Sequence, residues 1–67
     1  MVLAKASVDK IARKAGAERV SEGAVIVMTE YLEDFGIRVA KEAAALAKRA
    51  GRKTIRAEDI TLALERI

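Results

Sequence analysis

The chain has 67 residues, which is enough for one small domain and leaves no room for a second hydrophobic core. It contains no Cys and no His, so disulfides, thiolate metal sites and catalysis by a Ser-His or Cys-His pair are excluded within it. Thirteen basic and ten acidic residues give a net charge of +3, which favours an anionic partner. No apolar run approaches the length of a membrane span. We therefore expect a single domain over residues 1–67, in the cytoplasm and without a membrane partner.

The charges are distributed in blocks along the chain. Residues 1–20 carry five basic and two acidic side chains, residues 21–37 carry four acidic and no basic ones, and residues 38–56 carry seven basic and one acidic. We interpret the acidic middle block as an ordinary solvated helix surface. The basic stretches around 10–19 and 48–56 each flank an expected loop, which is where helical proteins expose binding groups.

The first expected helix covers residues 7–14, with Ser7 as its N-cap. Val8 and Ile11 have the spacing of one apolar helical face. Gly16 is expected to end this helix in the left-handed conformation that glycine adopts readily.

Ser21 caps the second expected helix, which meets no stop signal before Gly51 and therefore has about 28 residues. Such a helix is roughly 42 Å long, whereas a compact monomer of this size is about 28 Å across. Its apolar positions follow in steps of three and four: Ala24, Met28, Leu32, Phe35, Val39, Ala43, Leu46 and Ala50. A second copy crossing it antiparallel would cover this stripe, so we expect an obligate homodimer.

Residues 52–55 form a second connector, in which the β-branched Thr54 favours a short strand. A third helix is expected from about Arg56, with Glu58 and Asp59 in its first turn, where carboxylates are favourable. Neighbouring carboxylates on a helix point about 100° apart and form no pocket. We therefore expect no enzyme, no catalytic residue, no metal site and no cofactor.

Two motifs lie at the expected helix ends. The first is Ala15-Gly16-Ala17-Glu18-Arg19-Val20-Ser21, and the second is Ala50-Gly51-Arg52-Lys53-Thr54-Ile55, followed by Ala57-Glu58-Asp59-Ile60. With these motifs the chain resembles the histone fold in its minimal, tail-less archaeal form, over essentially its full length. The resemblance implies an all-α fold, with a short helix, a loop, a long helix, a loop and a short helix, that pairs head to tail as a handshake dimer.

The resemblance also implies the residues that contact DNA. Arg19 would enter the minor groove, and Lys53 and Thr54 would contact phosphate. Arg52 would pair with Asp59 and brace the second loop. The full set of expected DNA contacts is Lys10, Arg13, Lys14, Arg19, Val20, Ser21, Arg52, Lys53, Thr54 and Ile55. The expected dimer core is Met28, Leu32, Phe35 and Val39, and the expected contact between dimers is Leu46, Arg49, Asp59 and Leu62.

Two departures from the family pattern affect assembly. Much of the family has a histidine that pairs with the aspartate here numbered Asp59, but this chain has Arg49, which is bulkier and always charged. A weaker contact between dimers is expected. The chain also lacks the proline-containing start of many archaeal histones, so a looser start is expected.

The absence of Asn and Gln removes the side chains that normally read adenine in the major groove. Phosphate contacts and minor-groove arginine remain, and this mode senses how easily DNA bends. We therefore expect a sequence-nonspecific protein that bends, wraps and compacts duplex DNA on the chromosome. Its expected partners are double-stranded DNA, a second copy, a tetramer or longer assembly on DNA, and a paralogous histone in a heterodimer. The alternatives are a histone-fold subunit of a transcription-factor complex that acts through protein partners, and a helical protein-interaction module.

Overall fold

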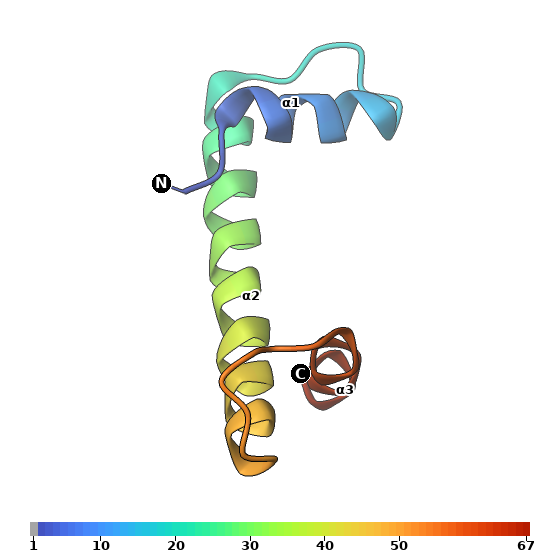
Figure 1. Cartoon of the computed structure of the whole chain (residues 1–67). Helices are drawn as coiled ribbons and strands as arrows, with labels where there is room; N and C mark the ends of the chain where they lie inside the picture. The colour runs from blue at the N-terminus through green and yellow to red at the C-terminus, as the bar shows by residue number, and fades with distance from the viewer. Residues whose placement is uncertain (1) are drawn as a thin grey trace. The chain divides into compact units, whose positions relative to one another are not determined.

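The computed structural model describes residues 2–67. That part of the chain contains three helices: α1 (Lys5–Lys14), α2 (Glu22–Arg49) and α3 (Ala57–Arg66) (Figure 1). It contains no strand, so the short strand expected at Thr54 is not formed in the single chain. No helix within residues 2–67 is long and apolar enough to cross a membrane. The chain forms two compact units, Met1–Asp34 and Phe35–Ile67, whose boundary falls within α2.

Both α1 and α2 end at a glycine with a positive φ angle, +109° at Gly16 and +75° at Gly51. The backbone N–H of the residue after each glycine donates to a carbonyl five residues earlier. This bond measures 2.9 Å from Arg52 to Ala47, and its equivalent after Gly16 measures 3.2 Å. The arrangement is a Schellman motif, which satisfies the last helical carbonyls and turns the chain sharply into a loop. The predicted ends of both helices are confirmed.

The starts of α1 and α2 differ. The Ser21 hydroxyl accepts a hydrogen bond from the Ala24 N–H at 3.1 Å, so the predicted cap of α2 is confirmed. The predicted cap of α1 is wrong, because this helix begins at Lys5 and its N-cap, Ala4, makes no side-chain hydrogen bond. Ser7 instead lies inside the first turn and donates its own N–H to the Ala4 carbonyl at 3.1 Å. Solvent-exposed N–H groups at a helix start can bind water, so a side-chain cap is not required there.

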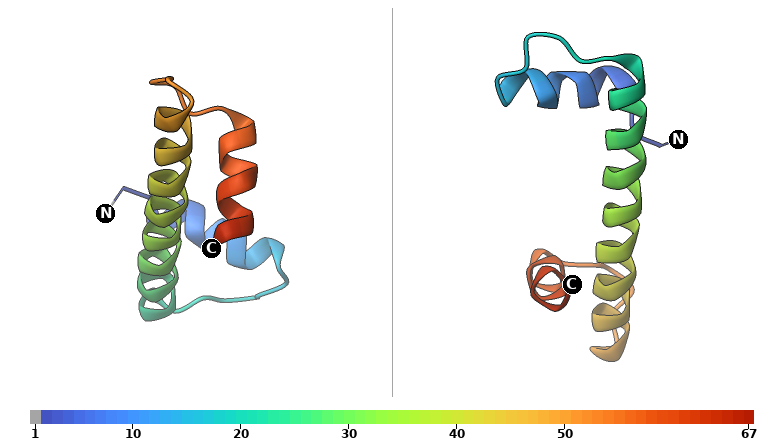
Figure 2. Two further views of the ribbon diagram at one scale, coloured as in Figure 1. Left: turned by 90° about the horizontal axis from the view of Figure 1, so that it is seen from below. Right: turned by 180° about the vertical axis from the view of Figure 1, so that it is seen from behind.

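In the first unit, α1 lies across the N-terminal part of α2 (Figures 1 and 2). The buried side chains are Val8 of α1 together with Val25 and Thr29 of α2. Thr29 is tolerated in this position because its hydroxyl donates to the Val25 carbonyl at 2.7 Å. The apolar stripe expected from the sequence is displaced here: Ala24 is exposed and Met28 is only half-buried.

In the second unit, α3 lies alongside the C-terminal part of α2 (Figures 1 and 2). Its core consists of Val39, Ala43 and Ala63, with Phe35, Leu46 and Ile60 packed against them. An ion pair of 3.0 Å between Arg66 and Glu42 also joins the two helices. The sequence predicted that Val39 lies in the dimer core and Leu46 in the contact between dimers. Both side chains already pack within their own chain. Their contacts with a second copy stay predictions.

The single chain buries little apolar surface. Its buried apolar side chains are Val8, Val25, Val39, Ala43, Ala47 and Ala63, of which half are alanine. Among residues 2–67, ten larger apolar side chains are exposed: Val2, Leu3, Ile11, Val27, Tyr31, Ile37, Ile55, Leu62, Leu64 and Ile67. Small domains are marginal when so much apolar surface faces water.

Candidate nucleic-acid interface

The first unit presents its expected DNA contacts on α1 and on the loop that follows. Lys10 and Lys14 are exposed on α1, and Arg19 is exposed in the loop. Val20 is half-buried. Ser21 uses its hydroxyl to cap α2, so this side chain holds the end of the loop in place.

Arg13 is exposed on α1 but is not free of partners. Its Nε donates to Asp9 Oδ2 at 2.8 Å, and its Nη1 donates to the Glu18 carbonyl at 3.5 Å. An exposed pair four residues apart on a helix is worth only about 0.3–0.5 kcal/mol. Arg13 can therefore exchange Asp9 for a phosphate group at little cost.

The second loop exposes Lys53, Thr54 and Ile55, all expected DNA contacts. Within residues 2–67, none of their three backbone N–H groups donates a hydrogen bond. The same is true of the N–H groups of residues 18–21 in the first loop. Backbone amides of this kind, beside exposed cations, are donors that bind phosphate oxygens. Both loops therefore combine positive charge with unused amide donors.

Arg52 and Asp59 brace the second loop. Arg52 donates through Nη1 to Oδ2 and through Nη2 to Oδ1 of Asp59, each at 2.9 Å, and through Nη1 to the Thr54 carbonyl at 2.9 Å. The Arg56 N–H donates to Asp59 Oδ2 at 2.8 Å at the start of α3. The hydrogen bonds from Arg52, and then that from Arg56, lower the pKa of Asp59 to about 2. The predicted internal pair is confirmed, whereas direct contact of Arg52 with DNA stays a prediction.

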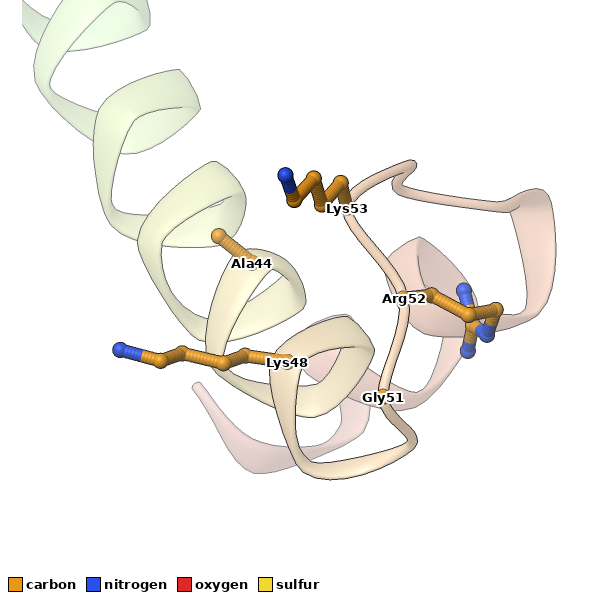
Figure 3. Close-up of a pocket in the computed structure, with 5 residues that line it drawn as sticks. All are labelled: Ala44, Lys48, Gly51, Arg52 and Lys53. Atoms are coloured by element: carbon orange, nitrogen blue, oxygen red, sulfur yellow. The ribbon is translucent and has the colours of Figure 1, made fainter.

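A shallow pocket of about 470 Å³ lies beside the second loop (Figure 3). It is lined by Ala44, Lys48, Gly51, Arg52 and Lys53. The side chains of Lys48 and Lys53 extend to the same side, whereas the Arg52 guanidinium points away from them (Figure 3). Lys48 was not among the expected contacts, although the basic block over residues 48–56 included it.

The residues expected between dimers have different environments in the single chain. Arg49 is exposed near the end of α2, and Leu62 is 41% exposed on α3. Leu46 is half-buried against the core of its own unit. Asp59 is only 5% exposed and is bound by Arg52, so its carboxylate is not an open acceptor. Within residues 2–67, no group of three or more acidic side chains is placed to hold a metal ion.

Two helices of 10 residues flank one of 28, joined by loops that follow Ala-Gly, and this organisation is that of the histone fold. Residues 1–64 match the family model described as "Histone-like transcription factor (CBF/NF-Y) and archaeal histone". The chain is 53% identical over 60 residues to one of the subunits of archaeal histone HAN1 from Thermococcus zilligii, covering 90% of each chain. It is 46% identical over 55 residues to "Probable archaeal histone 3" of Methanocaldococcus jannaschii, covering 82% of each.

The chain therefore belongs to the histone-fold family that comprises archaeal histones and histone-like transcription factors. This is a structural, DNA-binding family and not a family of enzymes. The resemblance inferred from the two loop motifs and the all-α histone fold are confirmed.

Proposed function

We propose that this protein is an architectural chromatin protein, which binds duplex DNA without reading its sequence and bends, wraps and compacts it. The observation that carries the proposal is the shared construction of the two loops. Each begins at a glycine-terminated helix, exposes at least one cation and leaves consecutive backbone N–H groups unused within residues 2–67. These groups fit phosphates at repeated positions along a backbone.

The chemistry of the interface supports nonspecific binding. Lys10, Lys14 and Lys53 are exposed point charges suited to phosphate oxygens. Arg19 has the length to enter a minor groove, where arginine responds to groove width and to the ease of bending. The chain supplies no Asn or Gln to read adenine in the major groove. Affinity would then come from the DNA backbone and from its deformability.

We propose that the functional unit is a homodimer in the handshake arrangement. In the part of the single chain that the structure describes, ten large apolar side chains are exposed. On α2, Met28, Leu32 and Phe35 are half-buried, on the part of the helix surface beside its buried positions. A second α2 crossing this row would remove it from water. Removing apolar surface from water contributes about 25 cal/mol for each Å², against which the entropy cost of association is set.

Assembly beyond the dimer is proposed to be weak. The expected contact would bring Arg49 towards Asp59 of another dimer. Asp59 is already held by Arg52 and by the Arg56 N–H of its own chain, so a second arginine gains less from it. A two-fold contact would also place two copies of Arg49 close together, and like charges repel. Tetramers or longer assemblies would then form mainly on DNA, where phosphates offset this repulsion.

The test is a titration of random-sequence duplex DNA by fluorescence anisotropy at several salt concentrations, followed by micrococcal nuclease digestion of the complexes. Wrapping predicts strong salt dependence and protected fragments whose lengths count the bound dimers. A protein that binds without protecting discrete lengths would contradict wrapping. One that does not bind duplex DNA would contradict the whole proposal.

A second candidate is a histone-fold subunit of a larger complex. The family description includes histone-like transcription factors, and one relative is named as a subunit. A paralogous histone would then replace the second copy of this chain in a heterodimer. Sedimentation of the purified chain distinguishes a homodimeric chromatin protein from a subunit of a larger complex, because a subunit that needs another partner would not form a stable homodimer. In either case the protein would act at the chromosome in the cytoplasm.

A further inference from the structure

We propose that Lys48 and Lys53 hold a single phosphate group between them, so that the last turn of α2 belongs to the DNA-binding surface. This inference rests on the proposed function and extends it to Lys48, a residue outside the expected DNA contacts. The supporting observation is the pocket beside the second loop, because it is lined both by Lys48 of α2 and by Lys53 of the loop (Figure 3).

The two lysines come from different elements and line one pocket, with their side chains extending to the same side of it (Figure 3). Lys48 lies in the last turn of α2, and Lys53 lies two residues after Gly51. The positive φ of Gly51 turns the chain back, so that Lys53 returns beside the helix that it has just left. Ala44 has only a methyl group and leaves the space between them open (Figure 3).

The charge in this pocket favours an anion. Within residues 2–67, no acidic residue lines it, and both lysines are exposed. Arg52 also lines the pocket, but its guanidinium points away and is neutralised by Asp59 at 2.9 Å. Two lysines therefore line the opening without an acidic counter-charge among the lining residues. A phosphate oxyanion suits such a pair, and the unused Lys53 N–H adds a nearby donor.

A simpler role for Lys48 has to be separated from this one. A cation in the last turn of a helix interacts favourably with the exposed carbonyl ends. That role would change the stability of the protein and leave DNA binding by the folded dimer unaltered. The decisive readout is therefore the salt dependence of binding, measured where every variant is folded and dimeric.

The experiment compares Lys48→Ala, Lys53→Ala and the double variant on random duplex DNA. Each single variant should flatten the slope of log affinity against log salt by about two, because one phosphate is released per chain in a dimer. The double variant should also flatten it by about two, since the same phosphate is lost. If the double variant instead flattened the slope by about four, the two lysines would contact two independent phosphates, and the proposal of one shared phosphate would be overturned. Lys41→Ala, an exposed lysine on α2 outside the pocket lining, is the matched control.

Occupation of the pocket is tested without changing charge. Ala44→Met fills the space with a residue of good helix propensity and should weaken DNA binding several-fold. Ala40→Met, at an exposed position of α2 outside the pocket lining, should leave binding unchanged. If Ala44→Met weakens self-association and leaves DNA binding per dimer unaltered, the pocket receives a second copy and the inference fails.

Free phosphate is the other source of the same chemistry. Replacing chloride with inorganic phosphate at constant ionic strength should not displace DNA if the pocket is built for a phosphodiester within a duplex. Selective loss of the Lys48 contribution in phosphate buffer would show an ion site and overturn the proposal. The wild-type titration distinguishes failure of the pocket inference from failure of the proposed function. If its slope is steep while Lys48→Ala behaves as wild type, the pocket inference alone fails. Without salt-dependent binding by the wild type, the proposed function fails first.

Discussion

Arg52 and Asp59 form an ion pair through two hydrogen bonds of 2.9 Å across the second loop. The pair joins Arg52, which lies three residues after the end of α2, to the first turn of α3. Since Asp59 also accepts the Arg56 N–H, one carboxylate holds the loop, the start of α3 and the arginine together.

This pair predicts a defined loss of stability in acid. The folded protein lowers the pKa of Asp59 from 3.8 to about 2, so the unfolded chain binds the proton more readily. The contribution is therefore fully present above about pH 4 and is lost as the pH falls towards 2. Asp59→Asn should lower the melting temperature at pH 7 and lose less on acidification across this window than the wild type. Glu65→Gln, at an exposed position of the same helix, serves as the control at equal protein concentration. Equal acid sensitivity of wild type and Asp59→Asn would contradict this role.

The long helix is predicted to hold an obligate dimer. Leu32→Asp should place an unpaired charge in the apolar contact between copies and cost several kcal/mol. Sedimentation and circular dichroism should show dissociation together with unfolding, because the single chain has a small core. Glu30→Ala, exposed on the same helix, should remain dimeric. A Leu32→Asp variant that is both folded and monomeric would rule out the handshake arrangement.

DNA binding is predicted to depend steeply on salt. Lys10, Lys14, Arg19 and Lys53 are exposed on each chain, and Arg13 adds a cation that Asp9 holds weakly. If about six of these contact phosphate in a dimer, log affinity should fall against log salt with a slope of roughly −5 to −6. Lys53→Ala should flatten this slope by about two, since a dimer loses two contacts. A wild-type slope near −1, measured by anisotropy, would be incompatible with wrapping.

Arg19 is predicted to help hold the DNA bend. Arg19→Ala should weaken binding more on stiff duplexes than on duplexes rich in flexible steps, because an arginine in the minor groove offsets part of the cost of bending. Parallel titrations on matched stiff and flexible duplexes measure the difference. Lys10→Ala should weaken binding to both duplexes equally and is the control for charge alone. A strong preference of the wild type for one unbent sequence would instead indicate direct base reading.

Arg49 is predicted to weaken the contact between dimers without abolishing it. Arg49→His removes a permanent charge from the expected two-fold contact, so crosslinking on DNA should shift towards larger assemblies. Leu62→Ala removes one of the two apolar side chains of this contact and should shift the distribution the opposite way. Unchanged or smaller assemblies with Arg49→His would mean that Arg49 already pairs well with Asp59 of another dimer.

Much of the fold was predictable from the sequence because local chemistry decides it. Gly16 and Gly51 end two helices, since glycine adopts positive φ without strain, and Ser21 begins α2 through its hydroxyl. The two loop motifs indicated the histone-fold family, and the resemblance to that family implied the pair between Arg52 and Asp59. Such features depend on the identity of a few residues close together in the chain.

The tertiary structure decided which side chains are buried and which cations are already engaged. Thr29 is polar, so the hydrophobic pattern of the sequence did not predict its burial. It is nevertheless fully buried, and its hydroxyl donates a hydrogen bond to the carbonyl of Val25. The grouping of Lys48 with Lys53 depends on the direction in which the loop returns after Gly51 (Figure 3). Periodicity places residues on a face of one helix, but it does not specify which other element packs against that face. The burial of side chains and the grouping of Lys48 with Lys53 at one pocket depend on that packing, so only the folded chain reveals them.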